Sequence, residues 1–316
     1  MNSLNYNNIL ITGGSGYIGS VLVPALLYLN YNVTVIDNFY YKQTSLLPNC
    51  YSKNFTIING DCRDEKLLTE HLNKCGVVIP LAAIVGAPLC SKDPFNAKSI
   101  NEDAIIKLCS LLKEGHRVIY PTTNSGYGIG QKGKFCDENT PLNPISLYGK
   151  TKVAAEKAVL GRKNSISYRL ATVFGTSSRM RLDLLVNDFV YRAVNDKCVT
   201  IFEGHFKRNY IHIRDVVRAF LFAISNFSRM KGNAYNVGLN KANLSKLELC
   251  AIIKKSLPEF IFREDSTGFD LDKRDYIVSN DKLMSLGFNP LDSLESGIEE
   301  LKKAYVFIKN NHYSNV

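Results

Sequence analysis

Two residues four positions apart, Tyr148 and Lys152, have side chains whose types and spacing fit a proton-transfer reaction. In a helix, that spacing places both side chains on one face. A phenol with an ordinary pKa of about 10 is a poor base at neutral pH, but a neighbouring ammonium and an oxidised nicotinamide both lower that pKa. Tyr148 would then accept a proton from a substrate hydroxyl while hydride leaves the same carbon atom. Thr123, at the end of the preceding strand, would hydrogen-bond that hydroxyl.

A Tyr-x-x-x-Lys pair is common by itself, and an exposed helical face is then the simpler explanation. Four features in one order along this chain favour catalysis instead. A glycine-rich turn and an acidic residue after the second strand come first, and a Thr/Ser loop after the fifth strand and the Tyr148 pair follow. This order predicts an oxidoreductase that binds a dinucleotide.

The predicted dinucleotide site begins at residues 12–19, TGGSGYIG, which follow an apolar strand and open a helix to about Asn30. The glycines at positions 13, 16 and 19 stand where a tight turn, the approach of a diphosphate and helix packing each exclude a Cβ. Backbone amides from Gly16 onward would face the phosphates, with the helix dipole behind them. In this turn we expect cofactor contacts from Gly13, Ser15, Gly16, Tyr17 and Ile18.

The rest of the predicted cofactor site lies where the next three strands end. A strand over 32–36 leads to Asp37, whose carboxylate would bind the adenosine ribose hydroxyls and repel a 2′-phosphate, so NAD is favoured over NADP. A strand over 55–60 delivers Asp61 and Cys62, which would hold adenine. The strand over 77–83 ends in small residues that would let the backbone lie close to the cofactor, although in the simpler interpretation they only pack. The predicted set also includes Asn38, Leu81, Ala82, Ala83, Tyr148 and Lys152.

Strand and helix patterns alternate through the first half of the chain, which is typical of a parallel, doubly wound α/β sheet, the Rossmann fold. The alternation continues with a helix over 94–112, a strand over 117–120, a helix from about Ile145 and a strand over 166–170. From residue 173 the elements are shorter. We therefore predict an NAD-binding domain over 1–172, to which residues 212–236 return, and a smaller, interleaved substrate-binding lobe over 173–316.

The composition excludes several functional classes. With 316 residues, 45% of them hydrophobic, the chain is long enough for one large α/β domain and a smaller lobe. No apolar run approaches about 18 residues and the polar start lacks a signal-peptide core, so we expect a cytoplasmic protein without a membrane partner. The eight cysteines include no CxxC pair, which disfavours both a metal site and a disulfide framework. The net charge of +10 comes from dispersed basic residues, so it favours a polyanionic small molecule over nucleic acid.

These motifs resemble those of the extended short-chain dehydrogenase/reductases, the NAD-dependent epimerase/dehydratase family acting on nucleotide sugars, and the resemblance covers nearly the whole chain. Residues 12–19 match the family's TGxxGxxG, and Tyr148 and Lys152 match its catalytic pair. The pattern R-x-Y-x-H-x-x-D at residues 208–215 matches its signature in the substrate lobe. The resemblance implies that Arg208 and Arg274 meet the nucleotide or its diphosphate. It also implies a homodimer paired through the helix of Tyr148.

Four longer strings resemble a narrower group within this family, the GDP-D-glycero-α-D-manno-heptose 4-dehydrogenases of bacterial capsule pathways. The strings are residues 79–90, 123–130, 179–189 and 273–276. This resemblance implies NAD-dependent oxidation at C4 of a GDP-heptose. It also implies substrate contacts from Val85, Asn124, Ser125, Arg179, Arg181, Asn187, Arg208 and Arg274.

Departures from the family pattern limit what can be transferred. Dehydratases of the group have an Asp-Glu pair after the threonine, whereas Asn124 and Ser125 follow Thr123 here, and neither can act as an acid or base at neutral pH. Many relatives have His where this chain has Pro80 and Asn where it has Thr172. Dehydration is thus disfavoured, but no single residue excludes a 4-epimerase, which begins with the same oxidation. A non-catalytic NAD-binding module is a third alternative, disfavoured because the Tyr148 and Lys152 pair is present.

Overall fold

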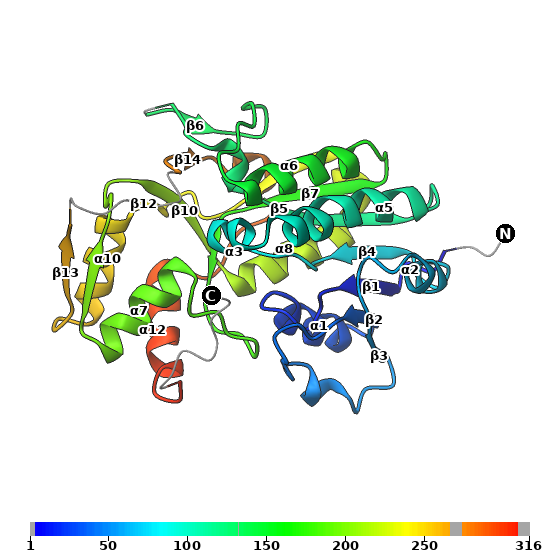
Figure 1. Cartoon of the computed structure of the whole chain (residues 1–316), viewed down its shortest axis with the longest axis horizontal. Coiled ribbons are helices and arrows are strands. Elements are labelled where there is room, and N and C mark those ends of the chain that lie inside the picture. The colour runs from blue at the N-terminus through cyan, green and yellow to red at the C-terminus, as the bar shows by residue number, and fades with distance from the viewer. Residues whose placement is uncertain (1–3, 132, 266–273, 309–316) are drawn as a thin grey trace.

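A seven-stranded parallel sheet forms the larger part of the computed structural model, which describes residues 4–131, 133–265 and 274–308 (Figure 1). Lys273, part of one string quoted above, lies outside the described residues. The strand order is β11-β7-β5-β4-β1-β2-β3, and every neighbouring pair is parallel. The strands are β1 (Asn8–Thr12), β2 (Asn32–Asp37), β3 (Phe55–Asn59), β4 (Val77–Pro80), β5 (Arg117–Thr123), β7 (Ser165–Leu170) and β11 (Asn233–Val237). The predicted doubly wound α/β fold is confirmed.

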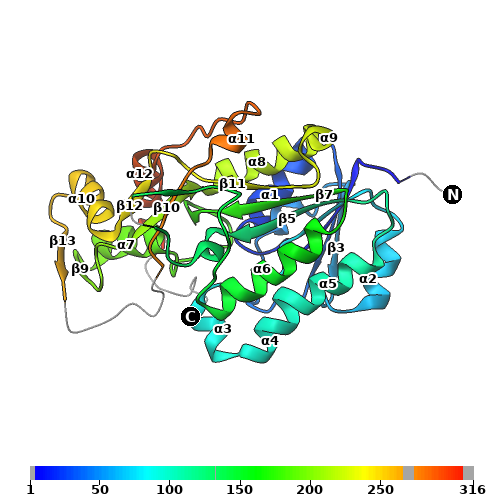
Figure 2. The ribbon, with the colours of Figure 1, turned by 90° about the horizontal axis from the view of Figure 1, so that it is seen from above.

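Helices cover both faces of this sheet (Figure 2). One face carries α1 (Gly19–Tyr28) and α8 (Ile213–Ser225), and the other carries α2 (Glu65–Leu72), α5 (Ala104–Leu111) and α6 (Leu147–Leu160). The alternation of side chains along β1 explains why both faces need cover. Ile9 and Ile11 lie in the hydrophobic core under α1 and α8, whereas Leu10 lies in the core under the other helices.

The chain between β4 and β5 differs from the prediction of one helix over 94–112. It forms α3 (Ala87–Lys92), α4 (Pro94–Lys98), a π-helical turn (Ser99–Asp103) and α5. The buried Asn101 side chain in the π turn accepts a hydrogen bond from the Ile84 amide and donates one to the Ile84 carbonyl, both at 2.8 Å. This irregular turn therefore holds the segment after β4. Strand β4 itself ends at Pro80, rather than at residue 83 as predicted.

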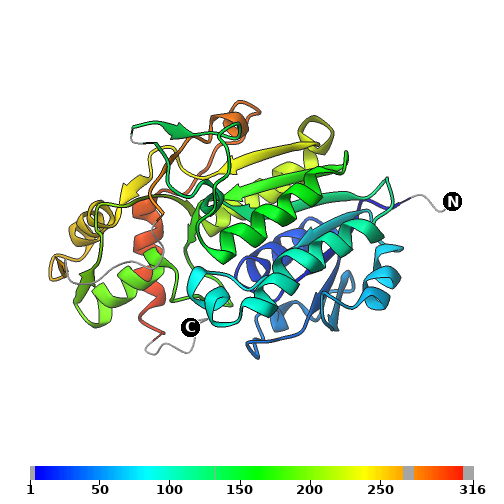
Figure 3. The same ribbon diagram turned by 45° about the horizontal axis from the view of Figure 1, so that its top comes forward.

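A smaller region stands at the end of the molecule opposite the N-terminus (Figures 1 and 3). Its three-stranded sheet has the order β12-β10-β8, and β9 pairs with β13 in a separate two-stranded sheet. A second core of residues such as Phe174, Val190, Leu249 and Ile298 joins these elements. The elements are β8 (Thr172–Phe174), α7 (Leu185–Asn195), β9 (Cys198–Ile201), β10 (Lys207–His212), β12 (Asn243–Ser245), α10 (Lys246–Ser256), β13 (Ile261–Glu264) and α12 (Leu294–Ala304).

The chain crosses between the two regions more than once. After β10 in the small sheet, α8 packs on α1, α9 (Phe227–Met230) follows, and β11 adds an edge strand to the large sheet. Between β5 and α6 the chain forms β6 (Phe135–Cys136), which pairs with β14 (Ile277–Val278). The division of the chain into domains near residue 172 stays a prediction. Among the described ranges, no helix combines the length and apolarity needed to cross a membrane.

Candidate active site

A cavity of about 610 Å³ lies where the parallel strands β1 to β5 and β7 end, between the large sheet and the smaller region. Its size is within the range of small-molecule sites. It brings together most of the residues predicted from the sequence: Gly13, Gly16, Tyr17, Ile18, Asp37, Asn38, Asp61, Cys62, Leu81, Ala82, Ala83, Val85, Thr123, Ser125, Tyr148, Lys152, Arg179, Arg181, Arg208 and Arg274. Three predicted residues, Ser15, Asn124 and Asn187, do not line the cavity.

The glycine turn fits a diphosphate for two reasons: there is no room for side chains at two of its glycines, and two of its backbone amides have no partner among the described residues. Gly13 has φ +70°, and a Cβ there would lie 2.5 Å from the backbone of Ala82; a Cβ on Gly19 would lie 2.2 Å from the Gly14 carbonyl oxygen. Ahead of the ten-residue helix α1, the backbone amides of Tyr17 and Ile18 donate to no described group. Amides of this kind at a helix N-terminus bind phosphate oxygens.

Asp37 ties the end of β2 to the glycine turn. Its Oδ2 accepts the Ser15 amide at 2.9 Å, and its Oδ1 accepts the Phe39 amide at 2.9 Å and Gln43 Nε2 at 3.2 Å. Burial raises the pKa of this carboxyl, while these three hydrogen bonds lower it. Ser15, which does not line the cavity, therefore acts through its amide as a support for Asp37.

Replacing Asp37 with alanine is expected to relax the preference for NAD over NADP. The change removes the negative charge beside the ribose 2′-position and also frees the Ser15 amide, so affinity for NAD itself should fall. Dissociation constants of both dinucleotides for wild-type and Asp37→Ala proteins measure the ratio, and Asp37→Arg should shift it further toward NADP. Tighter binding of NADP than of NAD by the wild-type protein would contradict the role given to Asp37.

The structure adds Arg63, which sequence reasoning missed, to the predicted adenine end. Its guanidinium binds the Asp61 carboxylate in a two-pronged ion pair, with distances of 2.9 and 2.7 Å, and its Nη1 donates to Asn96 and Ser99. These contacts link the loop after β3 to α4 and the π turn. In the sequence, only the position of Arg63, two residues after Asp61, could have indicated this role. At that spacing the Arg63 amide also donates to the Asp61 carboxylate.

Helix α6 carries the predicted catalytic pair. Ser146 caps the helix by accepting the Gly149 amide at 3.2 Å, and both Tyr148 and Lys152 face the cavity. Lys152 is only 4% exposed, and its Nζ lies 4.1 Å from the centre of the Tyr120 ring. The four-residue spacing therefore places both side chains on the face of the helix that lines the cavity, as expected.

The electrostatics of this pair differ from the prediction that the neighbouring Lys152 ammonium lowers the pKa of Tyr148. Burial raises the pKa of the Tyr148 phenol to about 12, and the cations that lower it are Arg181 and Arg274. Burial also lowers the pKa of Lys152 to about 7, although Glu156 opposes that shift. A half-protonated amine is a weaker source of positive charge than a full ammonium. The protein alone thus leaves Tyr148 protonated, and its ionisation depends on further positive charge in the cavity.

Thr123 is the last residue of β5, and its hydroxyl takes part in a series of hydrogen bonds. Its Oγ1 accepts the Ser125 amide at 3.1 Å and lies 2.8 Å from Ser125 Oγ, to which Arg274 Nη1 also donates. Asn124 is buried, lies outside the cavity lining, and has no hydrogen-bond partner for either side-chain polar atom among the described residues. The threonine and serine, rather than the asparagine, are therefore the groups of this loop that can reach a substrate.

The part of the cavity formed by the smaller region is basic. Arg179, Arg181, Arg208 and Arg274 line it, as does the buried Lys246, which sequence reasoning did not identify and whose Nζ donates to the Phe202 carbonyl at 2.7 Å. Arg181 pairs with Asp183. The Arg179 guanidinium lies 4.7 Å from the centre of the Tyr41 ring, which comes from the loop after β2. Arginines gathered in this way suit a diphosphate.

Tyr17 and Asn187 form part of the support for these arginines. The Tyr17 hydroxyl donates to the Gly175 carbonyl at 2.7 Å and accepts Asn187 Nδ2 at 3.3 Å. Asn187 is fully buried, accepts the Gly175 amide at 3.0 Å and donates to the Arg181 carbonyl at 2.9 Å. The Asn187 side chain is thus buried inside the protein and does not line the cavity.

Residues 9–238 of the chain match the model of a family described as the NAD dependent epimerase/dehydratase family. A putative UDP-glucose 4-epimerase of Methanocaldococcus jannaschii is 28% identical over 96% of this chain and 99% of its own. A UDP-glucuronic acid 4-epimerase of Bacillus cereus, solved with UDP-glucuronic acid and NAD, is 26% identical with a TM-score of 0.83, covering 95% of this chain and 99% of its own.

A third similarity extends the agreement in fold. A dTDP-glucose 4,6-dehydratase of Bacillus anthracis, solved in complex with NAD, superposes with a TM-score of 0.83 over 97% of this chain and 98% of its own, at 22% identity. Because epimerases and a dehydratase share one fold with this chain, the fold does not distinguish the reactions. The residues of the cavity must do so.

Proposed function

The chain belongs to the NAD dependent epimerase/dehydratase family, and from that premise we propose that it oxidises the C4 hydroxyl of a nucleotide-diphosphate sugar. NAD is the cofactor. One observation carries the proposal: a single cavity is lined by the glycine turn, by the Tyr148 and Lys152 pair, and by four arginines. A dinucleotide site, an acid–base pair and a basic substrate end are the parts that such an oxidation needs.

Each part of the reaction has a residue of this chain to perform it. Bound NAD supplies the hydride acceptor. The Tyr148 phenolate takes the proton of the C4 hydroxyl, which Thr123 Oγ1 orients through a hydrogen bond. Lys152, beside Tyr148 on α6, stabilises the phenolate and binds the ribose of the nicotinamide. Arg181 and Arg274 partly offset the rise in the pKa of Tyr148 that burial causes, and so favour the phenolate together with the bound cofactor.

The arginines of the smaller region are proposed to hold the diphosphate. Arg179, Arg181, Arg208 and Arg274 have the planar, multi-donor geometry that matches phosphate oxygens. The proposed substrate is a GDP-heptose, in particular GDP-D-glycero-α-D-manno-heptose, used in capsule or surface polysaccharide biosynthesis. That identity is supported by the strings around Thr123, Arg179 and Arg274. The proposed assembly is a homodimer paired through α6.

A 4-epimerase is the second candidate, favoured by the similarity to two proteins named as 4-epimerases. It would use the same oxidation, then return the hydride to the other face of the sugar. Dehydration is less well supported, because Asn124 is an amide outside the cavity and Ser125 is a hydroxyl bound to Thr123 and Arg274. Neither residue replaces the acidic pair that eliminates water.

The mass of the product is expected to separate the two candidates. If the protein is a dehydrogenase, the sugar leaves as a 4-keto species two mass units lighter, and the hydride is found on the nicotinamide or, after NAD is regenerated, on the acceptor. The assay should contain GDP-heptose, NAD and a keto-acid acceptor able to regenerate NAD, since a tightly held cofactor would stop after one turnover. UDP-glucose and UDP-glucuronic acid, assayed in parallel, test the choice of nucleotide and sugar.

The same experiment can reject the leading candidate. An epimerase gives a product with the mass of the substrate and inverted C4, and NADH does not accumulate at equilibrium. If GDP-heptose yields only that product, with no keto sugar trapped by hydroxylamine, the dehydrogenase proposal is wrong and the epimerase proposal stands. If no nucleotide sugar changes and none is bound, both proposals fail.

A further inference from the structure

The segment of residues 175–181, here named the arginine segment, carries two cavity arginines and lies between parts of the chain distant in sequence. It follows β8, and Arg179 and Arg181 reach the cavity from it. Contacts from the dinucleotide turn hold one side of the segment, and contacts from the C-terminal helix α12 hold the other. The position of the two guanidinium groups therefore depends on both supports, and on Asn187 of α7, which binds the two ends of the segment.

The support from the dinucleotide turn comes from Tyr17 and Ser20. The Tyr17 hydroxyl donates to the Gly175 carbonyl at 2.7 Å. Ser20 Oγ lies 2.6 Å from Ser177 Oγ and accepts the Arg179 amide at 3.3 Å. This side of the arginine segment is thus attached to the residues that open helix α1.

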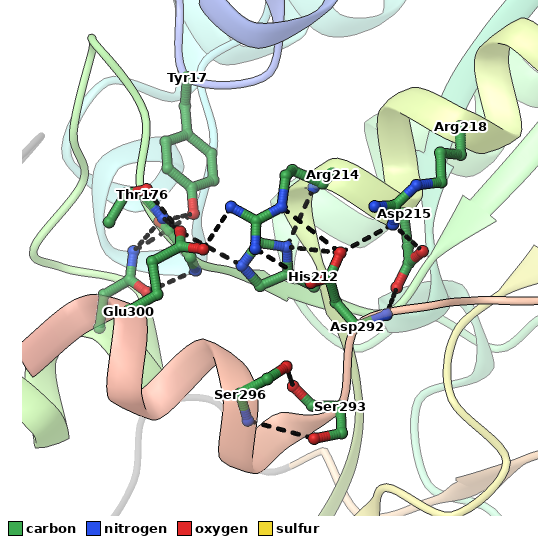
Figure 4. A network of polar contacts seen from close by, with 12 residues as sticks. Tyr17, Thr176, His212, Arg214, Asp215, Arg218, Asp292, Ser293, Ser296 and Glu300 are labelled. Carbon is green, nitrogen blue, oxygen red and sulfur yellow. Dashed lines mark hydrogen bonds and ion pairs between the residues drawn. The ribbon is translucent and has the colours of Figure 1, made fainter.

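The support from α12 comes from Glu300, whose carboxylate faces the beginning of the segment (Figure 4). Its Oε1 accepts the Thr176 amide at 2.9 Å and also the Thr176 hydroxyl. Arg214, in the first turn of α8, forms an ion pair with the same carboxylate. Glu300 therefore joins the arginine segment, α8 and α12, although it does not line the cavity.

His212 fixes the geometry between these elements. Its imidazole is fully buried, and its Nδ1 accepts the Arg214 amide at 3.2 Å as the cap of α8. The other ring nitrogen, Nε2, lies 3.4 Å from Glu300 Oε1. Gly175 has φ +111°, and a Cβ there would lie 2.3 Å from His212 Nε2, so the ring packs directly against the start of the arginine segment.

The carboxylate of Glu300 is charged at neutral pH. Burial acts to raise its pKa, but the contact with His212 and the hydrogen bonds from Thr176 outweigh burial and bring the pKa to about 2. The neighbouring charges are Arg214 on α8 and Asp292 before α12, which Arg214 also binds at 3.0 Å. A charged acceptor makes the stronger hydrogen bonds to Thr176.

We propose that Glu300 is a positioning residue for the substrate: it holds Thr176, and through it the arginine segment, so that Arg179 and Arg181 face the substrate diphosphate. The inference rests on the proposed function, because it assumes a nucleoside diphosphate in the basic end of the cavity. It extends the substrate site to α12, a helix that sequence motifs did not connect with binding.

The test compares Glu300→Ala with the matched variant Glu299→Ala. Glu299 is the preceding residue of the same helix, and its carboxylate binds Lys302 and Ser256 away from the cavity. Binding of GDP, and of UDP in parallel, is measured by calorimetry, and NAD binding is measured separately. Thr176→Val, which removes one donor to Glu300 and keeps the shape, provides a second variant should Glu300→Ala fold poorly.

Glu300→Ala is expected to weaken GDP binding by about tenfold, the lower end for losing hydrogen bonds to a charged group. The KM for the nucleotide sugar should rise by a similar factor with kcat little changed, and NAD affinity should stay within about threefold of wild type. Glu300→Gln keeps an acceptor for Thr176 and should restore most of the affinity. Thr176→Val should lie between Glu300→Ala and wild type, and Glu299→Ala should match wild type.

Two results would overturn the positioning role while leaving the proposed function intact. One is GDP binding by Glu300→Ala and Thr176→Val as tight as in the wild-type protein. The other is an equal loss of GDP and NAD affinity together with a lower melting temperature, which indicates general loosening. If the wild-type protein binds neither GDP nor UDP, the proposed function fails and this inference fails with it.

Discussion

Turnover of the nucleotide sugar is expected to fall by about 10²–10⁴-fold when Tyr148 is replaced by phenylalanine, the usual contribution of general acid–base catalysis. The change removes only the phenolic oxygen, and the ring that fills this part of the cavity remains. NAD affinity should therefore be nearly unchanged, since the glycine turn and Asp37 are untouched. Steady-state rates of product formation measure the turnover, and calorimetric titration with NAD measures the NAD affinity.

The control for this change is Tyr28→Phe, because Tyr28 is 87% exposed on α1 and does not line the cavity. It should retain wild-type turnover. The pH profile offers a further check, because burial raises the pKa of Tyr148 to about 12 in the protein without cofactor. An activity that survives in Tyr148→Phe at more than about a tenth of the wild-type rate would place the base elsewhere.

Lys152→Met is expected to reduce turnover by about 10²–10³-fold, the range for losing a preorganised electrostatic donor. Unlike Tyr148→Phe, it should also weaken NAD binding, because the proposed role of Lys152 includes the nicotinamide ribose. Lys150→Met is the matched control, since Lys150 lies on the same helix but is exposed to solvent. Wild-type NAD affinity in Lys152→Met would remove the cofactor contact from the proposal.

The same variant is expected to make the protein without cofactor more stable. Burial lowers the pKa of Lys152 from 10.5 to about 7, so below pH 7 the folded protein holds a buried ammonium at a cost. Between pH 7 and 10.5 the unfolded chain binds more protons than the folded one, and wild-type stability rises with pH. The advantage of Lys152→Met in melting temperature should thus be largest below pH 7 and shrink toward pH 10.5. A constant difference across this range would mean that Lys152 keeps its ordinary pKa in the fold.

The succession of strands and helices along the chain was predictable because it depends on short-range patterns. Apolar runs at strand length and the breaks between them are readable within a few residues. Short elements were missed for the same reason, as in β6 and β14, which have two residues each and exist through pairing with one another. The π turn was also missed, since it depends on the Asn101 side chain reaching Ile84 across a loop.

The sequence by itself determined the parts of the site whose geometry is local. Gly13 stands in a tight turn with φ +70°, Asp37 is the last residue of β2, and Tyr148 and Lys152 share a face because a helix has 3.6 residues per turn. These features need no knowledge of distant residues.

Only the tertiary structure decided how the predicted residues divide between cavity and support. Ser15, Asn124 and Asn187 carry plausible side chains, but all three are buried in the fold and none of them lines the cavity. The pKa of Lys152 depends on burial next to Tyr120, and the contact of Glu300 with Thr176 joins α12 to the loop after β8. Burial, pKa and such pairings are set by atoms brought together from distant parts of the chain, so a linear pattern does not contain them.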